Sequence, residues 1–192
     1  GAAALLFGHA WVLAIEFVML RCVAPGASIP LPTAWQLIRA WWGEIWTGMR
    51  VFGWRQPFRA GQYPDCVFAG KDGARRGLVL VHGFVCNRGL WNPWMARLRR
   101  EGVPHMAVNL EPVFGPIEHY VPIVEQAVHA LERATGLPPL IVAHSMGGLA
   151  VRAWLRDMRA DDRIHGVVTI GSPHHGTWLA RFALSSNTCQ MR

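Results

Sequence analysis

Ser145 stands where the residues on both sides favour nucleophilic chemistry. LPPLIVAH (residues 137–144) is typical of a buried strand, and MGGLAVRAWLRDMRA (146–160) has the apolar spacing of a helix. A nucleophilic serine needs such a junction, because the sharp turn projects the hydroxyl above the sheet and small neighbours let strand and helix approach. Gly147 is such a neighbour, although Ala143 rather than glycine lies two residues before the serine. The junction, more than the common S-x-G motif, favours a catalytic Ser145 over a serine in an ordinary turn.

A second stretch supplies groups that can stabilise a negatively charged oxygen. GLVLVH (77–82) is typical of a buried strand, and Gly83 follows it. A loop after such a strand commonly provides one backbone N–H of an oxyanion hole, and the residue after the nucleophile provides the other. We therefore expect the N–H groups of Phe84 and Met146 to be the donors. His82, at the strand end, is expected to satisfy local hydrogen bonds rather than to move a proton.

The proton-transfer partners of Ser145 are harder to find. A nucleophilic serine needs a base, and the base needs an acid that orients it. His144 directly precedes the serine, on the wrong side of the turn to act as its base. Asp157 lies on the helix that leaves the serine, and Asp161 and Asp162 lie in the turn beyond that helix. The remaining candidates are His165, His174 and His175.

The elements that must position these residues alternate along the chain. Apolar runs typical of strands occur at 77–82, 104–110, 137–144 and 164–171. Helical patterns lie between them, at 90–102, 117–136 and 146–160. Strands and helices that alternate at short spacing predict an α/β fold, with a mostly parallel sheet and helices on both faces.

Three ordered motifs in this region, VHGF, AHSMGG and TIGSPHHGT, together resemble the α/β-hydrolase superfamily. Within it they resemble the bacterial lipase and esterase branch, in which alanine replaces the first glycine of the nucleophile elbow. The resemblance covers residues 77–182 and implies Ser145 as nucleophile, with Phe84 and Met146 as oxyanion donors. It places GSPHHGT (171–177) near the site entrance, as a structural or substrate-lining loop. The residues that it implies as supports of the elbow and the oxyanion loop are His82, Gly83, His144 and Gly147.

The resemblance also implies elements that this sequence does not contain. In the superfamily the acid and the histidine follow two later strands, and neither strand is recognisable before Arg192. We therefore expect an α/β-hydrolase fold that lacks its C-terminal strands, in a fragment of a longer lipase. There are two alternatives. The chain is a degenerate member of the superfamily that binds lipids or partners without turnover, or one of its own histidines acts as the base in an unusual arrangement.

The residues before the hydrolase region form two further segments. Residues 2–20 are nearly all apolar and approach the length of about 20 residues that a bilayer-crossing helix needs. We interpret 1–22 as a hydrophobic membrane-anchor or signal-like helix, although His9 and Glu16 count against an anchor. A buried helix is the other alternative.

Residues 23–57 are rich in tryptophan and show a helical pattern. We expect this segment to form an amphipathic helix that lies on a membrane or packs against the rest of the chain. The residues expected on its apolar face are Trp35, Ile38, Trp42, Ile45, Met49 and Phe52. The hydrolase domain is then expected over 58–192.

Composition narrows the partners of the chain. The formal net charge is +7, but the basic residues are spread along the chain. They favour an anionic membrane surface over nucleic acid. The four cysteines show no spacing typical of metal ligands, and no metal or cofactor is implied. The sequence thus predicts a membrane-associated serine carboxylic-ester hydrolase that acts on lipids or other acyl esters. A lipid acyltransferase and a non-catalytic membrane-bound module are the alternatives.

Overall fold

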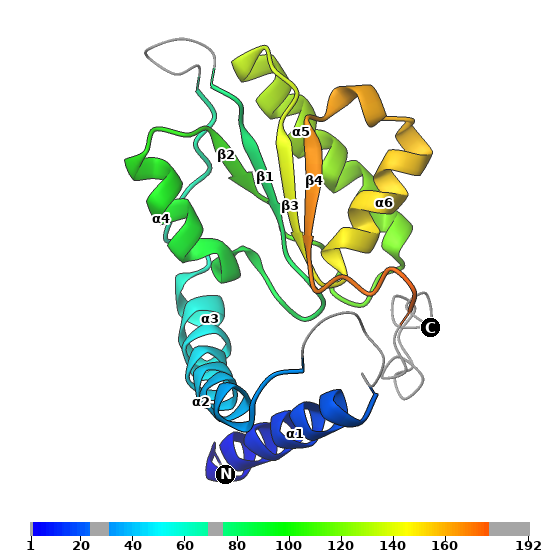
Figure 1. The fold of residues 1–192 in the computed structure, drawn as a ribbon. Helices are drawn as coiled ribbons and strands as arrows, with labels where there is room; N and C mark the ends of the chain where they lie inside the picture. Colours follow the sequence, from blue (N-terminus) through cyan, green and yellow to red (C-terminus); the bar gives the residue numbers. More distant parts are fainter. Residues whose placement is uncertain (1, 24–30, 69–74, 177–192) are drawn as a thin grey trace. The chain divides into compact units, whose positions relative to one another are not determined.

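The computed structural model of the chain describes residues 2–23, 31–68 and 75–176 (Figure 1). The chain divides into two compact units, Gly1–Phe58 and Arg59–Arg192. The last part of the expected hydrolase segment, residues 177–192, lies outside the described residues.

The first unit is helical. Helix α1 (Ala2–Val23) packs against helix α2 (Ala34–Arg50), and the indole N–H of Trp41 donates a hydrogen bond to the carbonyl of Ala10 at 2.8 Å. Helix α2 begins with a capping box, in which the side chains of Thr33 and Gln36 satisfy each other's backbone N–H groups. It continues through a π-helical turn, η1 (Val51–Arg55), into α3 (Gln56–Arg59).

Among the residues that the structure describes, no helix combines the length and the apolar character needed to cross a membrane. The interpretation of residues 1–22 as a membrane-spanning anchor is therefore not supported.

The second unit is built on a parallel sheet, as predicted. Its strands are β1 (Leu78–Val81), β2 (His105–Ala107), β3 (Leu140–His144) and β4 (Gly166–Ile170). They pair in the order β2-β1-β3-β4, and every pair is parallel (Figure 1). All four strands lie inside the ranges that the apolar runs indicated, so the predicted fold class is confirmed.

Helices connect these strands and end within two residues of the expected positions. The turn η2 (Arg88–Trp91) leads into α4 (Asn92–Arg100), and η3 (Ile117–Tyr120) leads into α5 (Val121–Thr135). Gly136 ends α5 with a φ of 68°, a conformation that glycine adopts without strain. Helix α6 (Gly147–Met158) follows β3, and η4 (Asp161–Arg163) precedes β4.

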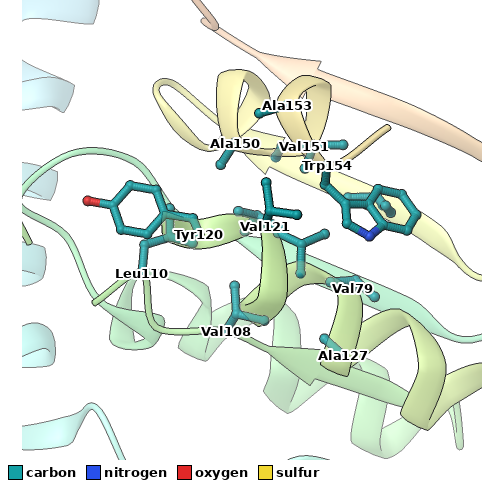
Figure 2. Close-up of a cluster of buried hydrophobic side chains, with 14 of the residues drawn as sticks. Val79, Val108, Leu110, Tyr120, Val121, Ala127, Ala150, Val151, Ala153 and Trp154 are labelled. Atoms are coloured by element: carbon teal, nitrogen blue, oxygen red, sulfur yellow. The ribbon is translucent and has the colours of Figure 1, made fainter. Parts of the chain in front are cut away.

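The two faces of the sheet are buried under different helices, because successive strand residues point to opposite faces. Val79 and Ile141 pack into the larger core with α5 and α6, where Trp154 is fully buried (Figure 2). Leu80 and Val142 point the other way, into a smaller core with Met95 of α4 and its neighbours. The prediction of helices on both faces is confirmed.

The order of the strands singles out one place on the sheet. From β1 the chain first moves to β2 at one edge, then returns past β1 to β3 and β4 on the other side. The connections that follow β1 and β3 therefore run toward opposite edges of the sheet, and in α/β folds ligands bind at the carboxyl ends of the strands beside such a switch in direction. Gly83 and Ser145 follow these two strands, so both lie at this point.

Candidate active site

Ser145 occupies the turn between β3 and α6 in a backbone conformation that is rare for its type. Its φ is 53°, in the left-handed region that residues other than glycine seldom adopt. The N–H of Ser145 donates to the carbonyl of Ile170 at 2.8 Å, and its carbonyl accepts the N–H of Gly148 at 3.0 Å. These bonds hold a turn that costs conformational energy, and strained turns of this kind cluster at functional sites.

Two glycines let the backbone segments of the site approach closely. A Cβ atom on Gly83 would lie 2.8 Å from the Cβ of Ser145, so the loop after β1 rests directly against the serine. A Cβ atom on Gly147 would lie 2.5 Å from the carbonyl oxygen of His82 and 2.9 Å from that of Val81. Real Cβ atoms do not come so near to backbone oxygen, so the start of α6 can rest on the end of β1 only with glycine at 147.

Two backbone N–H groups belong to residues next to the serine or to the loop that touches it. Met146 is buried at the N-terminus of α6, and Phe84 follows Gly83 in the loop that touches Ser145. Among the described residues, neither N–H donates a hydrogen bond. Because the N-terminus of a helix carries partial positive charge, the N–H of Met146 is suited to a developing negative charge.

The loop after β1 is held in a defined shape. Val85 has a φ of 53°, which is unusual for a β-branched residue, and the N–H of Cys86 donates to the carbonyl of Gly83 at 3.3 Å. The side chain of Asn109, from the loop after β2, accepts the N–H of Arg88 at 2.8 Å. The loop that carries Phe84 is thus tied to its own first residue and to the loop after β2.

The side chain of His82 links the loop after β1 to the loop after β2. Its side chain is buried, Nδ1 lies 2.8 Å from the carbonyl oxygen of Gly83, and Nε2 accepts the N–H of Leu110 at 3.0 Å. This arrangement requires the proton on Nδ1, which then donates to Gly83. Burial lowers the pKa of His82 below its ordinary value, so the ring is neutral. Both nitrogens serve the backbone, which leaves neither for proton transfer with Ser145.

The neutral state of His82 makes the stability of the fold depend on pH. Because the pKa of His82 is lower in the folded chain, the unfolded chain binds the proton first as the pH falls below about 6.5. We expect the free energy of unfolding to fall between about pH 7 and pH 5, and the fall to be shallower in His82→Asn. Urea unfolding of both proteins across this range measures the difference.

Burial also lowers the pKa of His105, but that residue is present in both proteins and cancels in the comparison. Parallel pH profiles for wild type and His82→Asn would contradict the assignment of this slope to His82.

An aromatic pair that the sequence analysis did not find lies next to the oxyanion loop. The rings of Phe84 and Phe114 meet edge to face with centroids 5.7 Å apart, and 63% of Phe114 is exposed. The buried hydroxyl of Tyr120 supports the loop that carries Phe114, since it lies within hydrogen-bond distance of the carbonyls of Pro112 (2.9 Å) and Gly115 (3.2 Å). No periodic pattern marks Phe114, because it stands alone in an irregular loop.

The family model of the alpha/beta hydrolase family matches residues 78–187, which is more than half of the chain. The chain belongs to this family. The match contains Ser145, the loop after β1 and the whole sheet.

Solved structures of lipases share the hydrolase fold. The mature form of the Bacillus licheniformis lipase BlEst2 is similar with a TM-score of 0.57 and 18% identity, over 66% of this chain and 59% of that one. Aspergillus fumigatus lipase B is similar with a TM-score of 0.51 and 17% identity, over 60% of this chain and 28% of that one. This chain therefore spans less than two thirds of either lipase. A search of curated proteins finds no match.

Within this hydrolase chain, the structure separates Ser145 from most of its candidate acids and bases. Asp157 is exposed and pairs with Arg156 at 2.6 Å, about 15 Å along α6 from the first residue of that helix. Asp161, Asp162 and His165 precede β4, so they lie at the opposite ends of the strands from the serine.

The remaining histidines lie nearer to Ser145 along the sheet. His174 follows β4 at the same end of the sheet, and its Nε2 lies 3.3 Å from the hydroxyl of Thr169. His175 is exposed, and His144 is partly buried directly before the serine. Among residues 146–176, no carboxylate hydrogen-bonds a histidine. The structure therefore brings Ser145 and Met146 close to the loop that carries Phe84, but among residues 146–176 it pairs no carboxylate with a histidine.

The described part of the chain also contains no group of three or more His, Cys, Asp or Glu residues that is placed to hold a metal ion. Thr177, the last residue of the GSPHHGT motif, lies outside the described residues.

Proposed function

We propose that the protein is a serine carboxylic-ester hydrolase whose nucleophile is Ser145. The observation that carries this proposal is the backbone of Ser145. It has a φ of 53° at the β3–α6 junction, with Gly83 resting against its Cβ. This is the geometry that a nucleophile elbow requires, and no structural need of the sheet explains such strain at a serine. Membership of the α/β-hydrolase family supports the same assignment.

The reaction proceeds through an acyl-enzyme. The Oγ of Ser145 forms a bond to the ester carbonyl carbon, and the carbonyl π electrons move to its oxygen. The N–H groups of Phe84 and Met146 bind this oxyanion, whose collapse expels the alcohol. The proton of the serine passes to that alcohol through a base, which the described residues do not supply. Water then attacks the acyl-enzyme by the same steps and releases the acid.

The surroundings of the serine favour an apolar acyl group. Phe84 contributes to the oxyanion hole through its backbone, which leaves its ring to meet Phe114 beside the reacting carbon. An acyl chain that lies against these two rings removes apolar surface from water. Lipids or other esters with apolar acyl chains are the substrates that fit this site best.

Covalent labelling tests the proposal. The full protein is treated with a fluorophosphonate, which phosphonylates activated serines, and the labelled peptide is identified by mass spectrometry. We expect the adduct on Ser145 and no other serine. An unlabelled protein, or an adduct elsewhere, would contradict the proposal. If untreated protein that is given an ester and a competing alcohol transfers the acyl group to the alcohol faster than to water, the activity is acyl transfer instead.

Phe114 offers a prediction about the chain length of the substrate. Because Phe114→Ala removes one of the two rings beside the acyl chain, we expect kcat/KM for p-nitrophenyl octanoate to fall about tenfold. The value for p-nitrophenyl acetate, whose acyl group is too short to reach the ring, should change little. Steady-state kinetics with both esters provides the measurement.

Met158→Ala is the matched control, because Met158 is a similarly apolar residue, 43% exposed, at the far end of α6. Equal losses with the two esters would show that Phe114 does not contact the acyl chain.

A further inference from the structure

Helix α2 carries an exposed row of large apolar side chains that the hydrolase activity does not use. Trp35, Ile38, Trp42 and Trp46 follow one another at spacings of three and four residues, so they share one face of the helix. Their exposed fractions are 66%, 47%, 61% and 61%. We call these four residues the aromatic strip. Single exposed apolar residues are ordinary, but a contiguous row along three turns marks an interaction surface.

The aromatic strip is distinct from the face of α2 that packs against α1. Trp41 and Gly48 face α1, since the indole of Trp41 bonds to Ala10 and a Cβ on Gly48 would lie 2.9 Å from the ring of His9. Ile45, which the sequence analysis placed on the apolar face of this helix, is buried, and Trp46 is exposed. The helix thus has two apolar faces, and α1 occupies one of them.

The charges around the strip are arranged asymmetrically. Arg39 lies four residues after Trp35 and Arg50 four residues after Trp46, so each arginine stands beside a tryptophan on the helix surface. Both arginines are exposed. Glu44, the acidic residue of this helix, lies two residues after Trp42 and therefore on the opposite side. The strip is bordered by positive charge without a nearby carboxylate on its own helix.

Helix α1 exposes apolar side chains as well. Trp11, Ile15 and Val18 are 70%, 57% and 65% exposed, at spacings of four and three residues. The whole first unit, residues 1–58, contains four arginines and two glutamates. Both of its long helices therefore present apolar surface, in a unit of net positive charge.

We propose that the aromatic strip binds the surface of a bilayer that contains anionic lipids. Indole rings suit the boundary between headgroups and acyl chains, because each has an apolar body and an N–H that bonds to polar groups. The helix would lie in the plane of the interface with its strip buried, while Arg39 and Arg50 reach anionic headgroups. This inference is independent of the ester-hydrolase proposal.

A second copy of the chain fits this face less well. A two-fold interface brings the same residues of both copies together, so the strip would need its own complement. Arg39 and Arg50 would then face the same arginines across the interface without a carboxylate from the strip side of α2. An anionic lipid surface supplies the missing negative charge.

Vesicle binding by the full chain tests the inference. Sucrose-loaded vesicles of phosphatidylcholine alone, or with phosphatidylglycerol, are sedimented with the protein, and the bound fraction gives a partition coefficient. We expect binding to the mixed vesicles to weaken at least about tenfold in the variant Trp35→Ser/Trp42→Ser/Trp46→Ser. The matched control is Phe68→Ser/Trp94→Ser/Met158→Ser, which changes exposed apolar residues of the second unit (40%, 44% and 43% exposed) and should bind like wild type.

A charge variant tests the anionic lipid separately. Arg39→Gln/Arg50→Gln should bind the mixed vesicles about 25-fold less than wild type, because each arginine near an anionic surface contributes about fivefold. Its binding to pure phosphatidylcholine should be unchanged. Arg100→Gln/Arg133→Gln removes the same charge from exposed positions of α4 and α5 and is the control.

Three outcomes would overturn the inference. The first is wild-type protein that stays in solution with both vesicle compositions. The second is a strip variant that binds as tightly as wild type. The third is a lipid-free dimer that the strip substitutions dissociate, which would make a second copy the occupant. Circular dichroism of each variant confirms that the exposed substitutions leave the fold intact.

Discussion

Ser145→Ala is expected to lower kcat for p-nitrophenyl butyrate by about 10⁴-fold or more, because the proposed acyl-enzyme forms on the hydroxyl of Ser145. Alanine keeps the turn between β3 and α6 but lacks the oxygen that attacks the carbonyl. Substrate affinity should change little, since the oxyanion donors and the aromatic pair remain. Steady-state kinetics on the purified full protein separates kcat from KM.

Ser172→Ala is the matched control for this substitution. Ser172 follows β4, and its Oγ lies 2.2 Å from the position that a Cβ on Gly148 would take, so it is a serine of the same region. It has no part in the proposed chemistry, and we expect kcat within about threefold of wild type. Comparable losses in the two variants would show that the region matters as a whole and that Ser145 is not the nucleophile.

Gly147→Ala is expected to lower the free energy of unfolding by about 2–4 kcal/mol and to disable the site. The added methyl group would lie 2.5 Å from the carbonyl oxygen of His82 and 2.9 Å from that of Val81, and these backbone atoms at the end of β1 do not rotate away. Helix α6 must then move off the strand. That movement would carry the N–H of Met146 away from Ser145 and weaken the oxyanion hole.

Urea unfolding measures the loss, and Gly166→Ala controls for the general effect of adding a methyl group in the same unit. A Cβ on Gly166 would meet only the Cδ1 of Leu140, at the ordinary distance of 3.8 Å. The control should therefore change stability by less than about 1 kcal/mol. A Gly147→Ala protein that is as stable and active as this control would mean that α6 is not held closely against β1.

Local patterns were sufficient to predict the fold because its elements have strong periodicity. Apolar runs such as 77–82 indicated strands buried on both faces, and the alternation with helices then required a parallel sheet. The strand–serine–helix order around Ser145 also predicted the position of its turn. The predictions about α2 were less complete. Periodicity showed an apolar face, but not that Ile45 is buried while Trp46 stays exposed.

The site could not be predicted in full, because it depends on contacts between segments that are distant along the chain. Phe114 meets Phe84 across two different loops, and no local pattern relates them. His82 shows the same limit, since its two bonds to Gly83 and Leu110 depend on how β1 and the loop after β2 lie together. Sequence reasoning predicted a structural histidine without naming its partners.

By itself, the sequence determined the order of strands and helices, the position of Ser145 at a strand end and the small residues around it, because these follow from periodicity and side-chain size. The tertiary structure alone decided that the carboxyl ends of β1 and β3 adjoin. There Gly83 lies against Ser145, and Gly147 lies against the backbone at the end of β1. The tertiary structure also left the aromatic strip uncovered. Such outcomes depend on packing between segments far apart in sequence, and local propensity carries no information about which of them will meet.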